Sequence, residues 1–467
     1  MINYSYFPYT RVIAAVAFFA GIILFWPGNL FFLNDDFLHL YLTSQGKWLQ
    51  QNSFRPVCDL SIWIDYQIWG LNAVGFHLTN VVLHLACTFL VYKLSILLLH
   101  KYHQSAIASA NAMLISSIFF VYAFHSETIF WVIGRSSSLG AMWFLFSVIF
   151  YLRRKEGTRY FFLSITMFVA GLLTYESVWI IPAVFGILSW MDVKSKTAAW
   201  KQESKYILIS LAVLISYFIV RYISIQQIIA PYEGERFLNF DIKGLAVNYV
   251  KLVLRSFSRQ SGDFYLIGLI FLISLTAAIS FVIARRKVFA AAILLLWLCS
   301  YLPYLSLGID TFGSESERYL YLPSIFLSVM MGIGIVNAAK VYKYIISLLF
   351  FFIHILFMYQ NRNAYEVASA VTAATIKELK NLSGKRTIYV LQLPQENNGA
   401  LIFRLGFEGA VKMYAHPSTR VVVVSRYEGN YTFFNGVSEQ SWTNGLPGEQ
   451  GKDAILDFSN SSLTVYH

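Results

Sequence analysis

The chain has 467 residues, of which 57% are hydrophobic and only 13% are charged. A soluble domain carries roughly 25% charged residues, so this composition excludes an ordinary soluble protein and predicts a polytopic membrane protein. The formal net charge of +11 does not indicate nucleic-acid binding. The basic residues instead stand in short clusters between apolar runs, as the positive-inside rule expects. The cysteines form no CxxC pair, and so indicate neither a disulfide framework nor a zinc site.

Apolar stretches long enough to cross a bilayer, about 20 residues each, recur along most of the chain. The first is too long for the core of a signal peptide and is predicted to be an uncleaved span. The predicted membrane helices are residues 12–33, 74–98, 105–124, 136–152, 160–175, 177–191, 206–223, 264–284, 288–307, 319–339 and 344–359.

The loops between these spans alternate in charge. One set is short and basic and is therefore predicted to face the cytoplasm. This set contains Lys101, Arg153, Arg154, Lys155, Arg159, Lys194, Lys196, Lys201, Lys205, Arg285, Arg286, Lys287, Lys340 and Lys343. The other set faces outward and contains nearly every polar motif of chemical interest. It comprises residues 34–73, 125–135, Glu176, 224–263 and 314–319. This clustering predicts a single outward-facing site.

The stretch 30–41, LFFLNDDFLHLY, places Asp35 and Asp36 where the first span leaves the membrane. Ionisable residues at a membrane boundary are often functional, so the two aspartates are candidate active-site residues. The alternative is helix capping, because Asn34, Asp35 and Asp36 are all good N-cap residues before FLHLYL.

The rest of the first outer loop is predicted to lie in the membrane interface. Residues 38–49 and 60–71 are apolar with interspersed tryptophan and tyrosine, which is typical of segments at headgroup depth. Such segments form a shelf suited to a lipid with a polar head. Arg55, between them, is a candidate substrate-binding residue or a snorkelling side chain that anchors a turn.

Three polar residues in the second span, His77, Asn80 and His84, are spaced i, i+3 and i+7 and share one helix face. Polar residues within spans generally face the bundle interior. His77 is a candidate for substrate binding. Hydrogen bonding between helices is the commoner role, and a metal site is the less favoured interpretation.

Charged residues also stand at the outer ends of later spans. Arg135 follows Glu127 at the mouth of the fourth span, and Glu317, Arg318 and Tyr319 precede the tenth. Arginine makes bidentate contacts with phosphate, so both arginines are candidates for a lipid phosphate. The alternative for each is a snorkelling arginine at the interface.

Two further segments lie outside the membrane. Residues 245–257 predict an amphipathic helix on the outer surface. Residues 360–467 contain no membrane run and predict a small extracytoplasmic α/β domain that follows a membrane domain over residues 1–359. Its predicted elements are helices at 364–379 and 400–414 and strands at 387–393, 420–425, 431–434, 454–458 and 463–466.

Four blocks follow one another along the chain: FRPVCDLSIWIDYQIWGLNAVGFHLTNVVLH (54–84), FHSETIFWVIGRSSSLGAMWFLFSVIFYLR (124–153), LLTYESVWIIP (172–182) and ERYLYLPS (317–324). In this order they resemble segments of the TMTC-type protein O-mannosyltransferases and their bacterial relatives, which are membrane glycosyltransferases with the GT-C fold. The chain departs from these proteins by lacking tetratricopeptide repeats, by an Asp-Asp pair where many relatives have Asp-Glu, and by YES in place of KE.

The resemblance implies an all-α polytopic membrane protein with the GT-C fold. The small C-terminal α/β domain is predicted from its own residues and lies outside the resemblance. The resemblance also implies inverting sugar transfer, on the outer side, from a polyprenyl-phosphate-linked donor to an acceptor hydroxyl. Asp35 is then the base and Asp36 positions substrate or raises the basicity of its neighbour, while Arg318 and Arg135 bind the donor phosphate. Glu127 and Glu176 are assigned to sugar hydroxyls or helix ends, and Glu317 and Tyr319 are candidate substrate-binding residues. We expect no cofactor, no obligatory metal and no nucleic-acid partner.

Three other functions fit parts of the pattern. A lipid-linked-sugar flippase or transporter would place polar or broken helices at mid-bilayer, whereas here the polar residues gather at helix mouths. An O-antigen ligase or polymerase would use a large late outer loop with arginines, and an inactive structural subunit would need no base. The acceptor (protein, glycan or lipid) stays open, and the short chain favours a bacterial inner membrane.

Overall fold

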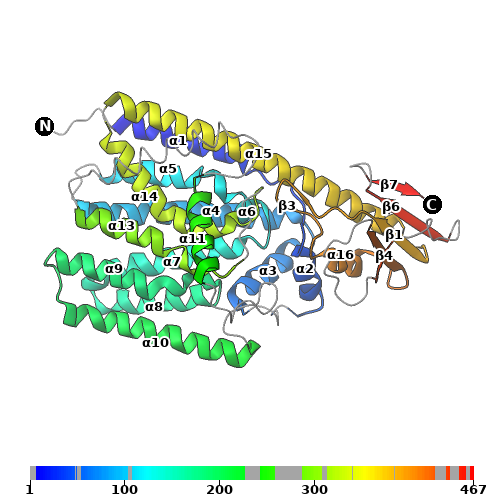
Figure 1. Ribbon diagram of the computed structural model, residues 1–467, viewed down its shortest axis with the longest axis horizontal. Coiled ribbons are helices and arrows are strands. Elements are labelled where there is room, and N and C mark those ends of the chain that lie inside the picture. The colour runs from blue at the N-terminus through cyan, green and yellow to red at the C-terminus, as the bar shows by residue number, and fades with distance from the viewer. Residues whose placement is uncertain are drawn as a thin grey trace.

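The computed structural model describes residues 7–47, 49, 54–103, 108–226, 242–257, 287–307, 313–338, 340–382, 384–425, 438–441, 452–458 and 463–466. Long helices lie side by side in an elongated bundle, and a small sheet-containing domain extends from one end of it (Figure 1). The N-terminus lies at the end of the bundle far from that domain, and the C-terminus lies within the domain. The end of the bundle next to the sheet domain is called the domain end below.

The bundle confirms a polytopic membrane protein. Within the described ranges, seven helices are long and apolar enough to cross a membrane, or eight if a bent pair over 108–120 and 123–130 is one span. The predicted span 264–284 lies outside the described residues. The bundle helices are α1 (Phe7–Leu24), α4 (Ala73–Leu98), α5 (Ala108–Phe120), α7 (Arg135–Leu152), α8 (Thr158–Leu172), α9 (Ile181–Lys194), α10 (Trp200–Ile225), α13 (Lys287–Cys299), α14 (Tyr321–Asn337) and α15 (Lys340–Asn381).

Two predicted boundaries differ from the structure. Helix α1 ends at Leu24 rather than at residue 33, because the following Pro27-Gly28 pair does not continue a helix. Helix α15 is one helix of 42 residues, so the predicted domain boundary at 359/360 falls inside it. Its sequence holds no glycine or proline, and a polar stretch alone does not break a helix. This helix therefore connects the bundle directly to the sheet domain (Figure 1).

The short basic loops meet at the end of the bundle away from the sheet domain. Their shared partner is the buried carboxylate of Asp192, near the end of α9. It lies 3.0 Å from the Lys101 amine, 2.7 Å from the Arg154 guanidinium and 3.2 Å from the Lys155 amine. Loops that the charge pattern assigned to one side therefore do converge at one end.

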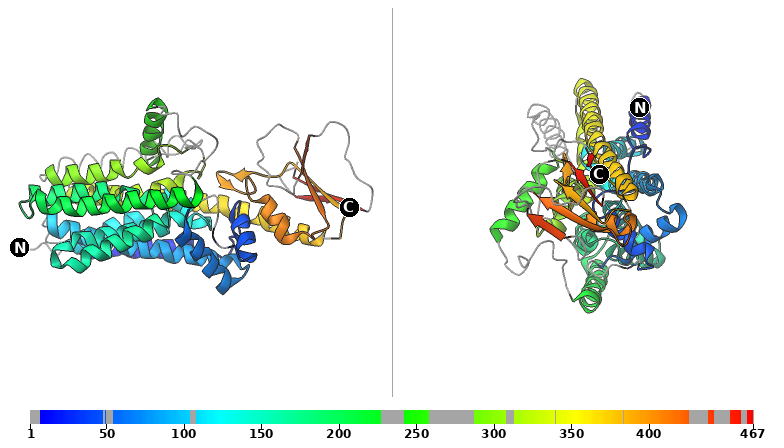
Figure 2. Two further views of the ribbon diagram at one scale, coloured as in Figure 1. Left: turned by 90° about the horizontal axis from the view of Figure 1, so that it is seen from below. Right: turned by 90° about the vertical axis from the view of Figure 1, so that its right-hand side faces the viewer.

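The predicted outer loops lie at the domain end. Helices α2 (Asp36–Ser44) and α3 (Pro56–Trp69) fill the junction between bundle and sheet domain (Figures 1 and 2). The predicted amphipathic helix is confirmed as α11 (Ile242–Arg255). Four short helices complete this end: η3 (Ala123–His125), α6 (Ser126–Phe130), η5 (Glu176–Ile180) and η7 (Glu317–Leu320).

The C-terminal domain is built on a five-stranded sheet in the order β5-β4-β1-β6-β7. Strands β5, β4, β1 and β6 are parallel, and β7 is antiparallel to β6. The predicted strand 431–434 lies outside the described residues. The elements are β1 (Thr387–Leu391), β2 (Glu396–Asn397), β3 (Ala400–Leu401), α16 (Phe407–Tyr414), β4 (Arg420–Ser425), β5 (Ser438–Ser441), β6 (Asp453–Asp457) and β7 (Thr464–Tyr466).

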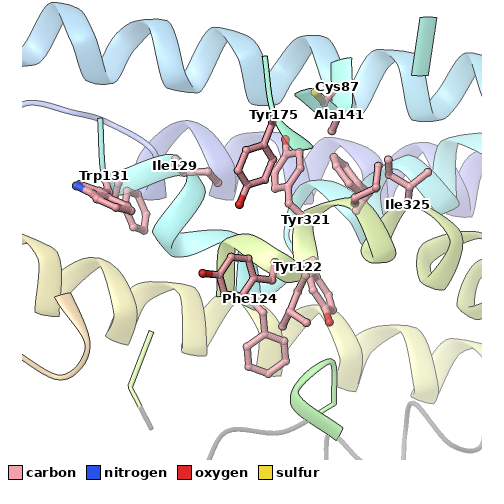
Figure 3. Close-up of a cluster of buried hydrophobic side chains, with 14 of the residues drawn as sticks. Cys87, Tyr122, Phe124, Ile129, Trp131, Ala141, Tyr175, Tyr321 and Ile325 are labelled. Atoms are coloured by element: carbon pink, nitrogen blue, oxygen red, sulfur yellow. The ribbon is translucent and has the colours of Figure 1, made fainter. Parts of the chain in front are cut away.

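A buried aromatic cluster lies in the bundle (Figure 3). Its tyrosines satisfy their hydroxyls internally, as buried polar groups must: the Tyr321 hydroxyl lies 2.8 Å from His84 Nδ1, and Tyr122 donates to the Ser256 carbonyl at 2.6 Å. Tyr321 belongs to the ERYLYLPS block and is fully buried. The second tyrosine of that block therefore supports the core.

Candidate active site

Asp35 stands at the N-cap position of α2 with its side chain partly exposed. Its carboxylate forms no ion pair within the described residues, and it accepts a long hydrogen bond, 3.5 Å, from Asn34 Nδ2 to Oδ1. No side-chain capping bond is formed at this position. The carboxylate is therefore not consumed by helix capping, which was the alternative interpretation of the acidic pair.

The carboxylate of Asp36, in contrast, is held by hydrogen bonds. It is fully buried and accepts hydrogen bonds from the Leu33 amide at 2.9 Å and from the Ile133 amide at 3.1 Å. Burial, and then the charge of Asp35, raise the pKa of Asp36 well above its ordinary value, while the two amide donors act in the other direction. Asp36 therefore joins the first outer loop to the turn after α6, and both of its carboxylate oxygens are engaged there.

Three arginines from distant parts of the chain lie near Asp35. Arg318, Arg55 and Arg404 each lie close enough to lower its pKa. Each is held by a glutamate: Glu127 for Arg318, Glu176 for Arg55 and Glu315 for Arg404. The three guanidinium groups are called the arginine rim below. Because each pair comes from different elements, the rim is set by tertiary structure and is preorganised.

The Arg318 guanidinium is held by a carboxylate, a hydroxyl and an aromatic ring. It pairs with the buried Glu127 carboxylate, which also accepts the Arg318 backbone amide at 2.9 Å. A second guanidinium nitrogen donates to the Tyr319 hydroxyl at 2.9 Å, and the group lies 5.3 Å from the centroid of the Trp131 ring. Glu127 and Tyr319, both predicted to bind substrate, thus contact Arg318.

Arg55 and Glu176 form the second part of the rim. Arg55 Nη2 lies 2.9 Å from Glu176 Oε2, and the guanidinium lies 4.8 Å from the centroid of the Tyr175 ring. The other Glu176 oxygen accepts from the buried Arg221 at 3.0 Å. The YES sequence thereby contributes a carboxylate shared between two arginines and an aromatic face at the site.

Arg404 comes from the C-terminal domain. Its guanidinium donates to both oxygens of Glu315 at 3.0 and 2.6 Å, a bidentate pair. Glu315 lies just before η7. No motif in the sequence indicated Arg404.

The pKa of Asp35 is raised from 3.8 to about 6, mainly because burial disfavours the charged form. Arg318 is the strongest of the groups that oppose this rise, followed by the backbone, Arg55 and Arg404. A carboxylate with a pKa of about 6 is ionised at neutral pH and is a stronger base than an ordinary aspartate. One turn along α2, burial and then Arg55 lower the pKa of His39 to about 3, so this imidazole is neutral.

The structure does not place Arg135 on the rim, and the prediction that it binds a phosphate does not fit. Its guanidinium is fully buried, lies 2.6 Å from Asp65 and donates to the Phe76 carbonyl at 2.9 Å. From the sequence alone, a buried arginine of α7 that pairs with a carboxylate of α3 looks the same as an arginine that faces a lipid headgroup.

Removing the Arg135 charge is expected to destabilise the protein by about 3–5 kcal/mol, because the buried Asp65 carboxylate loses its partner. Thermal unfolding of Arg135→Met in detergent measures this loss. The double variant with Asp65→Leu removes both charges and is expected to recover most of the stability. No recovery in the double variant would argue against the pair as the cause.

Other predicted site residues serve the bundle. His77 hydrogen-bonds to the Phe31 carbonyl at 3.1 Å, and Asn80 donates to the Trp131 carbonyl at 2.8 Å. Glu317 is fully buried, accepts from Ser126 and lies 3.1 Å from Arg255. The structure thus does not bring His77 or Glu317 to Asp35. Among the residues that the structure describes, no group of three or more His, Cys, Asp or Glu side chains could hold a metal ion.

No protein-family model matches the chain. Protein O-mannosyl-transferase Tmtc1 of Drosophila melanogaster is 30% identical over 149 residues, 31% of this chain and 16% of that protein. TMTC2 of Homo sapiens is 31% identical over 119 residues, 26% of this chain and 13% of that protein. The chain is similar to the TMTC protein O-mannosyl-transferases. It matches only a small part of their length.

The fold is confirmed by solved structures. ArnT from Cupriavidus metallidurans, solved in the apo state, superposes with a TM-score of 0.53 at 10% identity over 89% of this chain and 86% of that one. A second ArnT structure, bound to undecaprenyl phosphate, gives 0.50 over the same coverage. The chain therefore has the GT-C fold of ArnT, as the resemblance to the TMTC proteins implied.

Proposed function

We propose that the chain is an integral membrane inverting glycosyltransferase that moves a sugar from a polyprenyl-phosphate-linked donor to an acceptor hydroxyl. The observation that carries the proposal is Asp35, a carboxylate with a raised pKa and no ion pair in the described residues, which lies near the arginine rim. The similarity to TMTC mannosyl-transferases and the fold of ArnT, one structure of which holds undecaprenyl phosphate, support the same chemistry.

In this reaction Asp35 accepts the proton of the acceptor hydroxyl. The hydroxyl oxygen forms a bond to the anomeric carbon, while the bond from that carbon to the phosphate oxygen breaks. The electron pair of the broken bond leaves with the polyprenyl phosphate, and the configuration at the anomeric carbon inverts. General-base catalysis of this kind contributes about 10²–10⁴-fold to the rate.

The arginine rim suits the leaving group. A phosphodiester becomes a phosphomonoester, so negative charge grows on its oxygens during the reaction. A preorganised cation stabilises that charge more in the transition state than in the ground state. Arg318, held by Glu127 and Tyr319, is the principal donor in this proposal, with Arg55 beside it.

The site is proposed to face the outside of the membrane. Basic loops gather around Asp192 at one end of the bundle, and the positive-inside rule assigns that end to the cytoplasm. The C-terminal domain lies at the other end (Figure 2), and it contacts Asn34, the residue that precedes Asp35. Nucleotide sugars are absent outside the cytoplasm, which is consistent with a lipid-linked donor. A bacterial inner membrane is the proposed location.

Binding of undecaprenyl phosphate tests the proposed role of the rim. Arg318→Gln is expected to weaken binding at least about 10-fold, because one charge-assisted bidentate contact is lost. Arg318→Lys keeps the positive charge that pairs with Glu127, so its affinity is expected to lie between those of Arg318→Gln and the wild type. Native mass spectrometry of the full chain in detergent measures the bound fraction.

Arg153→Gln is the matched control for this experiment. Arg153 is an exposed arginine at the other end of the bundle, paired with Glu156 at 2.7 Å. Its replacement should leave binding unchanged. Equal affinities for Arg318→Gln and Arg153→Gln would contradict the assignment of the rim to the donor phosphate.

A further inference from the structure

The C-terminal domain contacts the residues around Asp35 through residues 402–409, which run from the end of β3 into the first turn of α16. The Asn34 backbone amide donates to the Ile402 carbonyl at 2.7 Å, and the Leu405 amide donates to the Asn34 side-chain oxygen at 2.8 Å. Asn34 is fully buried by these contacts. Residues more than 360 positions away in the sequence thus hold the residue that directly precedes Asp35.

Asn34 has a left-handed backbone conformation, with φ of +48°. Residues other than glycine, asparagine and aspartate rarely adopt this conformation, because their Cβ meets the backbone. The conformation of Asn34 sets the direction in which the chain enters α2. It therefore sets the direction of the Asp35 side chain.

The two backbones approach each other with no side chain between them. A Cβ added to Gly406 would overlap the Asn34 carbonyl oxygen, and one added to Gly409 would lie 2.8 Å from the Leu38 amide nitrogen. The φ of Gly406 is −102°, which any residue can adopt. Gly406 is therefore required by space, and a larger residue must push segment 402–409 away from Asn34.

We infer that segment 402–409 is a positioning element of the active site, which holds Asn34 left-handed and so aims the Asp35 carboxylate at the acceptor. The inference rests on the proposed function. The same segment carries Arg404 to the rim, so the soluble domain completes a site that is otherwise built by the membrane domain. In this arrangement Gly406 and Asn34 act through Asp35 and do not touch substrate.

Gly406→Ala tests the inference, with Gly384→Ala as control. Gly384 lies in the same domain, and a Cβ there meets nothing within 4 Å. The readout is release of polyprenyl phosphate from hexosyl-phosphoryl-undecaprenol by the full chain in detergent, with envelope extract supplying acceptor. Gly406→Ala is expected to lower kcat about 10–100-fold with little change in the KM for donor, because a displacement of about 1 Å costs about that much. Gly384→Ala is expected to match the wild type.

A second pair of variants covers the case in which Gly406→Ala does not fold. Asn34→Gly keeps the left-handed conformation accessible, whereas Asn34→Ala opposes it, and both lose the bond from Leu405. Asn34→Ala is expected to have the lower kcat, by about 10-fold. Two results would overturn the inference and leave the proposed function standing, provided that Asp35→Asn is inactive. One is equal kcat for Asn34→Gly and Asn34→Ala, and the other is equal kcat for Gly406→Ala and Gly384→Ala. Full activity of Asp35→Asn would overturn the proposed function and the inference with it.

Discussion

Asp35→Asn is expected to lower sugar transfer by about 10²–10⁴-fold, because the amide cannot accept the proton of the acceptor hydroxyl. The fold should survive, since the carboxylate forms only a 3.5 Å hydrogen bond with Asn34 and no ion pair in the described residues. Binding of undecaprenyl phosphate should persist, because the arginine rim is unchanged. Initial rates and phosphate binding, measured on one preparation in detergent, check both statements.

Asp36→Asn is the matched comparison. The amide nitrogen cannot accept from either the Leu33 or the Ile133 amide, so one buried N–H loses its partner. Such a loss costs about 1–3 kcal/mol. Asp36→Asn should therefore lower the melting temperature, whereas Asp35→Asn should not. If the two variants lost activity equally and were equally unstable, the assignment of different roles to the two acids would be wrong.

The rate of transfer is expected to rise with pH through a midpoint of about 6. The raised pKa of Asp35 means that the base is protonated and inactive below this value and ionised above it. An unperturbed aspartate would already be ionised at pH 5. The pH dependence of kcat/KM reports this group in the free enzyme.

Arg318→Gln should move that midpoint to higher pH, because Arg318 is the strongest of the groups that lower the pKa of Asp35. Arg318→Lys should move it less. The sign for stability is opposite to that for activity: the folded pKa lies above the unfolded one, so stability from Asp35 is present below pH 3.8 and is lost as pH rises through about 6. Asp35→Asn should therefore melt no lower than wild type at pH 8. A rate profile that is flat from pH 5 to pH 8 would contradict Asp35 as the base.

Much of the fold follows from hydrophobic length and charge. Apolar runs predicted the bundle helices. The alternating basic loops predicted that Lys101, Arg154 and Lys155 lie at one end of the bundle, where all three pair with Asp192. These properties are local, since each span satisfies its own backbone hydrogen bonds in lipid. The end of α1 was predictable from Pro27, because the helix ends at Leu24, nine residues before the predicted end at residue 33.

The site was only partly predictable, because a charged residue in a membrane protein can either line the site or pair with an opposite charge in the buried core. Arg318 and Arg135 have similar sequence contexts, yet one faces Asp35 and the other is buried on Asp65. Which arginine meets which carboxylate depends on helix packing. The contribution of Arg404 depends on how the C-terminal domain docks.

The most direct test of the account is sugar transfer by the purified chain in detergent micelles, where no second compartment exists. The account predicts turnover of hexosyl-phosphoryl-undecaprenol, with undecaprenyl phosphate and glycosylated acceptor formed in equal amounts and the anomeric configuration inverted. No turnover in micelles, together with movement of the same lipid across vesicles, would contradict it and identify a flippase instead.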